Sequence, residues 1–349
     1  MGSKGTSGGG GGGGGDTTPP SPRRLPLVPP PTSLSREPSA ISTSPPPLQP
    51  PRAPPRAADR DTEPLSDLIL KSSNNYIIQE KIKILSKQYG LLRRTWSDGS
   101  CFYRALLFSY LENLGQMQDR QAEVFRLMQC VEVSTKRFYQ LEWGEAYLLK
   151  PEFLSSLVFE FYCLVNSVAN GLTSEKLYER SLEDPSSGTI MYFLRVLTEV
   201  EIRTQDIYRP FIPKDMDVVQ YCRKKVRGVF PEAKVEALQF CRTKVCHQYA
   251  EAEAIQMRAL TYALGIPLRV EIVDTKSMPG QAVRVKRLDF FNRSGLGKRP
   301  YHIVQSYYSS STAHKPLERG SNDNLLSLDG TPLLTLLSRH GCCDILYPK

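Results

Sequence analysis

The sequence predicts an α+β fold that is preceded by a long tail outside the folded domain. After residue 60, apolar residues recur at helical spacing through the first two-thirds of the chain. In the last third, segments of alternating, β-branched residues replace this pattern. Helices first and strands afterwards are typical of domains in which the helices and the sheet are segregated. We therefore expect one domain over residues 61–349, which is long enough to bury a large core.

Residues 1–60 have the composition of a disordered segment. An unbroken glycine run, Gly8 to Gly15, is followed by five clusters of prolines and almost no aromatic residues. Such a chain cannot bury enough apolar surface to offset the entropy lost on ordering. The tail holds seven basic and three acidic residues and so supplies a good part of the net charge of +9. The remaining chain has no basic stripe interleaved with aromatic residues, so we do not expect it to bind nucleic acid.

Five helices are expected in the domain. The first spans Asn75 to Gly90, because Ile78, Ile82, Leu85 and Tyr89 share one face between an Asn start signal and a Gly stop signal. The others are expected at Phe102–Leu114, Glu152–Ser167, Thr189–Val200 and Ala252–Leu264.

Three strands are expected near the C-terminus, at Leu268–Asp274, Leu333–Leu337 and Ile345–Tyr347. Between them, residues 290–330 are polar and rich in Ser, Asn and Gly. A stretch that long without periodicity is typical of an irregular insertion or a mobile loop.

Cysteine usage and hydropathy predict the compartment. Eight cysteines without an apolar signal segment favour a reducing environment, the cytoplasm or the nucleus. No run approaches the ~20 apolar residues needed to cross a bilayer. The start, Met1-Gly2-Ser3-Lys4-Gly5-Thr6, fits a loose myristoylation pattern, and an acid-poor tail with Ser and Arg also fits a transit peptide.

The segment Asp98-Gly99-Ser100-Cys101-Phe102-Tyr103-Arg104 carries the clearest chemical signal. It places Cys101 one residue after a Gly-Ser turn, where a helical pattern begins. Backbone N–H groups freed by the turn and the positive end of the helix dipole favour a thiolate, the form that attacks carbonyl carbons. A buried structural cysteine is the alternative interpretation.

No metal site or cofactor is predicted. Cys241, Cys246 and His247 lie close together, but a zinc site needs a second pair of ligands that the sequence does not offer. His302 and His314 lie in or beside polar, irregular sequence and are weaker candidates for catalysis.

The domain resembles the otubains, ubiquitin thioesterases of the ovarian-tumour type. The resemblance is carried by Gln79-Glu80-Lys81-Ile82-Lys83, Leu92-Arg93-Arg94-Thr95, the Cys101 segment, Pro210-Phe211-Ile212 and Cys343-Asp344-Ile345-Leu346-Tyr347. It implies a papain-like cysteine protease fold with a small central sheet flanked by helices. It also implies cleavage of isopeptide bonds of ubiquitin and polyubiquitin, with Cys101 as the nucleophile. Asp98 would lie in the turn that shapes the oxyanion site, and Asp344 would orient the catalytic histidine.

The sequence departs from the family at that histidine. Otubains end in Gly-His-Tyr-Asp-Ile-Leu-Tyr, whereas this chain has Gly341-Cys342-Cys343-Asp344. A thiol with a pKa near 8.5 cannot replace an imidazole near 6.5 as a base at neutral pH. His340 is the candidate substitute base, because residues 340 and 342 of a strand share a face. It would start ~6.5 Å too far along that strand, a gap that a kink at Gly341 would have to shorten.

A second departure lies in the segment that the family places near ubiquitin. Relatives carry Ser-Asp-His-Val-His-Ile there, whereas Glu253 and Gln256 are the polar candidates for substrate binding in this chain. We therefore expect a deubiquitinase with impaired activity. The alternative is an inactive module that binds ubiquitin or a ubiquitin-conjugating enzyme, and a third hypothesis is a scaffold that recruits partners through its proline-rich tail.

Overall fold

A seven-stranded sheet forms the centre of the domain. The computed structural model describes residues 62–72, 74–96, 99–143, 151–182, 184–227, 252–277, 280–291, 303–309, 325–340 and 342–349. In the order β1-β2-β7-β6-β3-β4-β5, neighbouring strands pair antiparallel except β3 and β6, which are parallel. The strands are β1 (Glu63–Pro64), β2 (Tyr89–Arg93), β3 (Leu268–Val273), β4 (Val285–Phe290), β5 (Ile303–Tyr308), β6 (Thr335–Arg339) and β7 (Cys342–Pro348).

The three predicted strands are confirmed as β3, β6 and β7, although β6 begins two residues later than expected. The prediction that residues 290–330 are irregular throughout is wrong, because β5 lies within them and pairs with β4. The sequence of β5, Ile-Val-Gln-Ser-Tyr-Tyr, is rich in β-branched and aromatic residues, a strand signal that the polar sequence on both sides obscured. Residues 292–302 and 310–324 of this insertion lie outside the described residues, as does the predicted tail.

The five predicted helices are confirmed, with one correction at an end. The main helices are α1 (Asp67–Lys71), α2 (Tyr76–Leu85), α3 (Cys101–Leu114), α4 (Arg120–Tyr139), α5 (Pro151–Ala169), α6 (Ser174–Leu182), α7 (Asp184–Thr204) and α10 (Ala254–Leu264). Short turns η2 (Asp206–Phe211), α8 (Val218–Tyr221) and η3 (Cys222–Arg227) precede α10. Asn75 caps α2 as expected, its side chain accepting a hydrogen bond from the Ile78 amide at 3.1 Å. The helix ends at Leu85 and not at Gly90, because Tyr89 to Arg93 pair with β7 instead.

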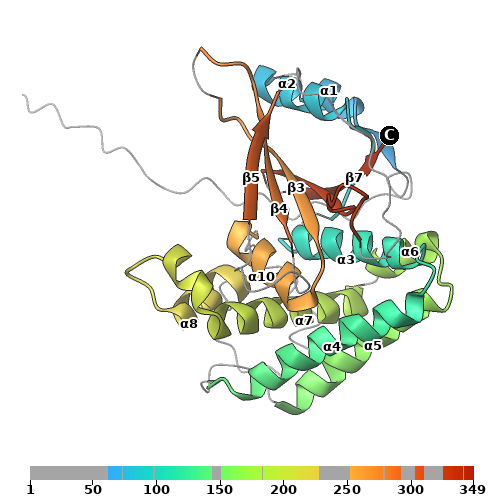
Figure 1. The fold of residues 1–349 in the computed structure, drawn as a ribbon, viewed down its shortest axis with the longest axis vertical. Coiled ribbons are helices and arrows are strands. Elements are labelled where there is room, and N and C mark those ends of the chain that lie inside the picture. The colour runs from blue at the N-terminus through green and yellow to red at the C-terminus, as the bar shows by residue number, and fades with distance from the viewer. Residues whose placement is uncertain are drawn as a thin grey trace, which may run out of the picture. The chain divides into compact units, whose positions relative to one another are not determined.

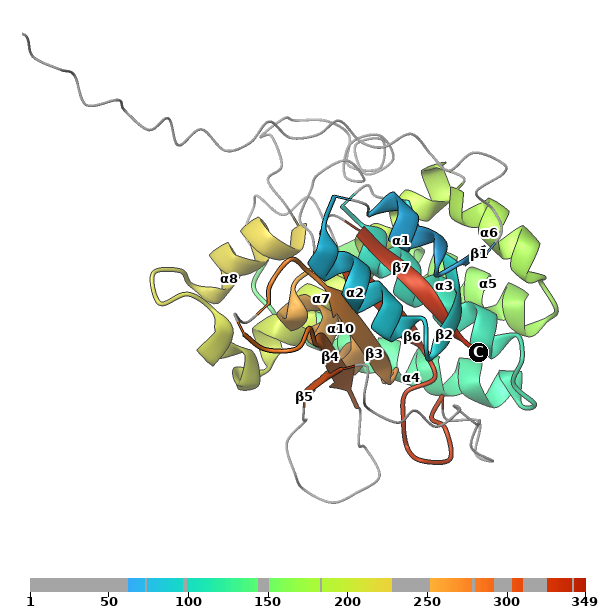
Figure 2. The ribbon, with the colours of Figure 1, turned by 90° about the horizontal axis from the view of Figure 1, so that it is seen from above.

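Helices cover both faces of the sheet (Figures 1 and 2). Helices α1 and α2 lie on one face and close a small core with Leu337 and Leu346. The larger helical layer lies on the other face, where Leu336 and Ile345 belong to a core shared with α3, α4, α5, α7 and α10. Successive residues of β6 and β7 thus point to opposite faces, as strand geometry requires. None of the described helices combines the length and hydropathy needed to span a bilayer.

Gly265, which ends α10, offers a test of local backbone strain. Its φ of 65° lies in the left-handed region, where a Cβ atom costs about 1–2 kcal/mol. We expect Gly265→Ala to lower the free energy of unfolding by that amount in urea denaturation. Gly115, which ends α3, is the matched control because its φ of −59° suits any residue and an added Cβ would meet its nearest neighbour at an ordinary 3.5 Å. An equal loss of stability in Gly115→Ala would contradict the backbone explanation.

Candidate active site

Cys101 is the first residue of α3, as the sequence predicts. Gly99 supplies the chain reversal with a φ of 80°, and the Cys101 side chain is 5% exposed. The first turn of a helix has N–H groups without helical partners and a positive dipole end, both of which stabilise negative charge. The position therefore suits a nucleophilic sulfur. Asp98, the predicted oxyanion-site residue, lies outside the described residues.

Arg195 of α7 binds the turn of Gly99 and Ser100 that precedes Cys101. Its Nη2 donates to the Gly99 carbonyl at 2.8 Å and to the Ser100 hydroxyl at 3.1 Å, and its Nη1 donates to the Val226 carbonyl at 2.5 Å. The guanidinium also lies 4.5 Å from the ring centroid of Tyr103. Sequence reasoning missed this residue, although a single arginine within the apolar run Ile190–Leu197 was a usable signal. Arg195 thus fixes the backbone of Gly99 and Ser100 directly before Cys101.

Asp344, the predicted acid, is 1% exposed and fully engaged by the chain itself. One carboxylate oxygen accepts a hydrogen bond from the Thr95 amide at 3.1 Å, and the other forms an ion pair with Arg339. Burial by itself lowers the pKa of Arg339, but the charge and hydrogen bond of Asp344, together with the charges of Cys342 and Glu63, raise that pKa overall. The acid that would orient an imidazole in this family is therefore paired with a guanidinium.

Thr95 ties the segment before the cysteine turn to the strand that carries Asp344. Besides the amide bond to Asp344, its hydroxyl donates to the Cys343 carbonyl. The segment that precedes Cys101 and strand β7 are thus joined at a fixed register, although 248 residues separate Thr95 from Cys343. The sequence motifs contained both segments but gave no sign of this bond.

His340 lies in the turn between β6 and β7 and is exposed. Among the hydrogen bonds and ion pairs of the described residues, none joins it to Cys101 or Asp344. Cys342 lies opposite Arg339 in the ladder between β6 and β7 and is half-buried. The role of His340 as a substitute base stays a prediction.

Glu253 and Gln256, the predicted substrate-binding residues, form a capping box at the start of α10. The Glu253 amide donates to the Gln256 side chain at 2.9 Å, and the Gln256 amide group donates to the Tyr221 hydroxyl at 3.2 Å. Gln256 is fully buried, so in this conformation it offers no surface to a substrate. Glu253 is exposed and lies 2.8 Å from Lys225, and its contact with a substrate remains a prediction.

A cavity of about 440 Å³ begins one helical turn along α3 from the cysteine. Its walls are mainly apolar and aromatic, and come from the end of β2, from α3, α5, α6 and α7, and from Ile345 of β7. Among the α3 residues that line the cavity, Arg104 is nearest to Cys101 along the helix, and its guanidinium lies 5.2 Å from the Trp96 ring centroid.

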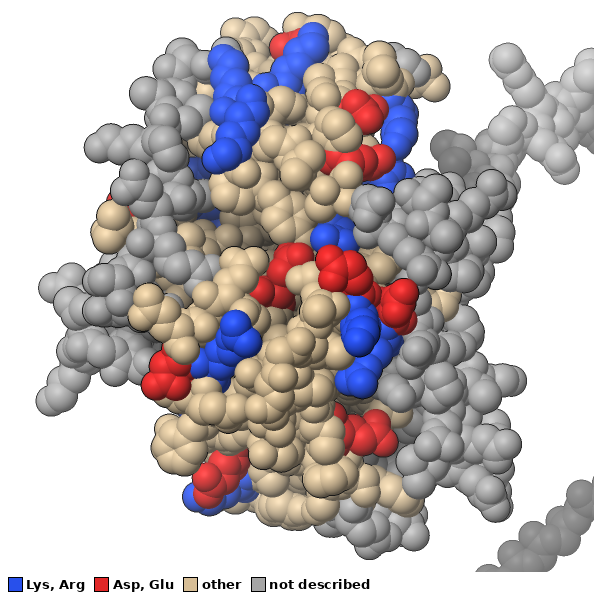
Figure 3. All heavy atoms as spheres, turned by 90° about the vertical axis from the view of Figure 1, so that its right-hand side faces the viewer, with Lys and Arg blue, Asp and Glu red and all other residues tan. Residues whose placement is uncertain are grey.

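Charged residues of both signs are interspersed on the face shown in Figure 3, and no continuous basic band crosses its described surface. Within the described ranges, no three His, Cys, Asp or Glu side chains converge in a way that would hold a metal ion.

A cysteine at the start of a buried helix, packed beside a strand that carries a buried acid, is the arrangement of a papain-like cysteine hydrolase. The family model described as Peptidase C65 Otubain matches residues 55–239 and 230–348. The chain therefore belongs to the otubain family.

Named relatives agree with this assignment. The ovarian tumor domain-containing deubiquitinating enzyme 1 of Arabidopsis thaliana is 32% identical over 293 residues, which cover 83% of this chain and 80% of that protein. Ubiquitin thioesterase OTUB2 of Mus musculus is 33% identical over 211 residues, covering 57% and 74%. The solved h/ceOTUB1–ubiquitin aldehyde–UBC13~Ub complex matches the fold with a TM-score of 0.55 at 21% identity, over 83% of this chain and 90% of that chain. The predicted α+β, papain-like fold is thereby confirmed.

Proposed function

We propose that this otubain binds ubiquitin through the family surface and cleaves isopeptide bonds only very slowly. The observation that carries the proposal is the pairing of Asp344 with Arg339, while Cys342 occupies the position of the family's histidine. Relatives named as ubiquitin thioesterases support ubiquitin as the ligand. Solved neighbours that contain ubiquitin aldehyde with UBC13~Ub or UBCH5B~Ub support ubiquitin-conjugating enzymes as further partners.

The chemistry explains why the missing imidazole matters most for isopeptides. When the sulfur attacks the carbonyl, a tetrahedral intermediate forms, and the lysine amine can leave only after it receives a proton. The base that deprotonates the nucleophile normally returns this proton. Its loss costs about a million-fold in turnover in a serine hydrolase with the same division of roles. A thioester of ubiquitin has a leaving group that needs no proton, so the defect should be smaller for it.

We expect the protein to bind mono-ubiquitin with a Kd that Cys101→Ala leaves unchanged, measured by calorimetry.

A ubiquitin probe with a C-terminal electrophile should label Cys101, because that reaction forms a bond without expelling an amine. Di-ubiquitin should remain uncut under conditions in which a small thioester of ubiquitin is consumed. Absence of ubiquitin binding by folded protein would refute the proposal.

A second candidate function is isopeptide hydrolysis with His340 as the base. The observation in its favour is the position of His340, two residues before Cys342 in the turn that leads into β7. It predicts measurable di-ubiquitin cleavage that His340→Ala abolishes while ubiquitin binding persists. Cleavage that survives this substitution would exclude His340 from the reaction.

A further inference from the structure

Helix α3 and strand β7 lie against each other and run in the same direction. At one end, the Tyr347 hydroxyl of β7 donates to the Glu112 carboxylate of α3 at 2.8 Å. At the other end, Thr95, just before the cysteine turn, binds the carbonyl of Cys343. The eleven residues from Glu112 back to Cys101 span about 16 Å of helix. The four residues from Tyr347 back to Cys343 span about 13 Å of strand. Cys101 and Cys343 therefore lie at the same end of the packed pair formed by α3 and β7.

The side chain of Cys343, and not that of Cys342, faces the helix. Cys343 and Ile345 belong to the core that they share with α3, including Cys101, whereas Leu346 belongs to the core on the other face. Because side chains alternate along a strand, Cys342 is directed away from α3. Burial first, and then the charge of Cys101, raise the pKa of Cys343, which agrees with two neighbouring sulfurs.

We propose that Cys101 and Cys343 form a redox pair that closes to a disulfide when the protein meets hydrogen peroxide. The Cys101 sulfur attacks one peroxide oxygen, the O–O bond breaks, and Cys101 becomes a sulfenic acid while water is released. The Cys343 sulfur then attacks the Cys101 sulfur, the S–O bond breaks, and the departing hydroxide takes the Cys343 proton as a second water. Two thiols are oxidised to one disulfide and one peroxide is reduced to two waters.

The exposure and charge around each cysteine determine that Cys101 reacts with peroxide first and Cys343 second. Cys343 is 2% exposed and has a raised pKa, so it holds its proton and reacts poorly with peroxide on its own. Cys101 is 5% exposed at the positive end of α3, where a small oxidant reaches the sulfur more readily than glutathione disulfide can. Cys343 then acts as the resolving thiol that protects Cys101 from further, irreversible oxidation.

The pair exists because this chain carries a thiol where its family carries an aromatic residue. The inference does not depend on whether the protein hydrolyses ubiquitin conjugates. If the proposed ubiquitin reactivity is correct, closing the disulfide withdraws the Cys101 sulfur from it, and a reductant restores it.

Peptide mapping of the full-length protein tests whether Cys101 and Cys343 form this disulfide. Trypsin releases Cys101 in the peptide of residues 95–104, and both Cys342 and Cys343 in the peptide of residues 340–349. After peroxide treatment, non-reducing mass spectrometry should find these peptides joined, and dithiothreitol should separate them. The joined peptide should persist in Cys342→Ser, the matched control, and disappear in Cys343→Ser and Cys343→Ala. In the latter variants, dimedone labelling of Cys101 should rise severalfold.

Two results would overturn the proposal. One is a cross-link that survives in Cys343→Ser and is lost in Cys342→Ser, which would assign the resolving role to the other thiol. The other is equal dimedone labelling of Cys101 in wild type and Cys343→Ala without any cross-link. Circular dichroism verifies that each variant is folded. If the Cys343 variants do not fold, fragment ions of the wild-type peptide that separate residues 342 and 343 decide the partner.

Discussion

Replacing Cys342 by histidine is expected to raise the rate of di-ubiquitin cleavage by about 10²–10⁴-fold, the usual contribution of a positioned general base. The recovery should fall short of about a million-fold, because the imidazole has to share Asp344 with Arg339. Residues 342 and 344 lie on the same side of β7, so an imidazole at 342 would stand beside the Asp344 carboxylate. Cys342 occupies the position of the family's histidine at the start of β7, so the substitution restores the family's residue beside its acid.

The regained activity should depend on pH in a defined direction. An imidazole with a pKa near 6.5 accepts a proton only when neutral, so cleavage should rise from pH 5.5 and level off above about pH 7.5. Gel assays of di-ubiquitin cleavage across this range measure the profile. Cys342→Ser is the matched control, because it removes the thiol and adds no base. His340→Ala in the Cys342→His background should leave the rate unchanged.

Failure of Cys342→His to gain activity, in a protein that still binds ubiquitin, would shift the explanation to the Arg339–Asp344 ion pair. The imidazole has to share the Asp344 carboxylate with Arg339, and this pair is nearly buried. In that case a missing base would not be the only defect. Cys342→His combined with Arg339→Gln separates the two causes, because it frees the carboxylate without adding a second base.

Local patterns predicted those parts of the site that depend on neighbouring residues. The Gly-Ser turn before Cys101 and the apolar stripe after it were sufficient to place this cysteine at the start of a helix. The terminal motif placed Asp344 on a strand. These features are set by backbone preferences and by burial of one face, both of which a sequence records directly.

The residues that hold the site together were not predicted, because their partners are distant in sequence. Arg195 binds Gly99 across 96 residues, and Thr95 binds Asp344 across 249. Neither polar residue breaks a local pattern strongly enough to reveal its partner. The same reason explains the end of α2, where pairing of Tyr89 with β7 overrode a helical periodicity that continued to Gly90.

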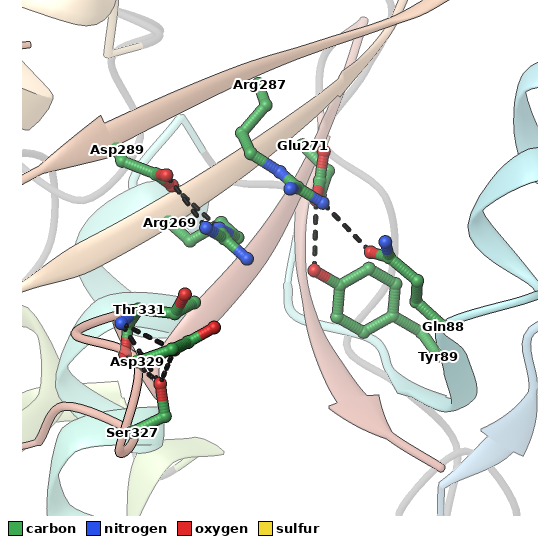
Figure 4. A network of polar contacts seen from close by, with 9 residues as sticks. All are labelled: Gln88, Tyr89, Arg269, Glu271, Arg287, Asp289, Ser327, Asp329 and Thr331. Carbon is green, nitrogen blue, oxygen red and sulfur yellow. Dashed lines mark hydrogen bonds and ion pairs between the residues drawn. The ribbon is translucent and has the colours of Figure 1, made fainter. Parts of the chain in front are cut away.

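The largest loss of stability is expected from Glu271→Ala, far from the cysteine. Glu271 of β3 is completely buried, and its carboxylate accepts hydrogen bonds from Arg287 at 2.6 and 2.8 Å and from the Tyr89 hydroxyl at 3.0 Å (Figure 4). Removing one partner of a buried ion pair leaves an uncompensated charge and costs about 3–5 kcal/mol. Arg287, the direct cross-strand neighbour on β4, would be that charge. Equilibrium unfolding in urea measures the effect.

The companion variants show whether the cost comes from the unpaired guanidinium. Glu271→Met combined with Arg287→Met replaces both charges by apolar side chains of similar length, and should recover most of the stability that Glu271→Ala loses. Glu132→Ala is a matched control, because it removes the acid from an exposed ion pair with Lys136 on α4, where solvent screens the interaction. We expect little change there. If the double variant were as unstable as Glu271→Ala, the loss would come from packing around β3, since no buried charge would remain unpaired at this position.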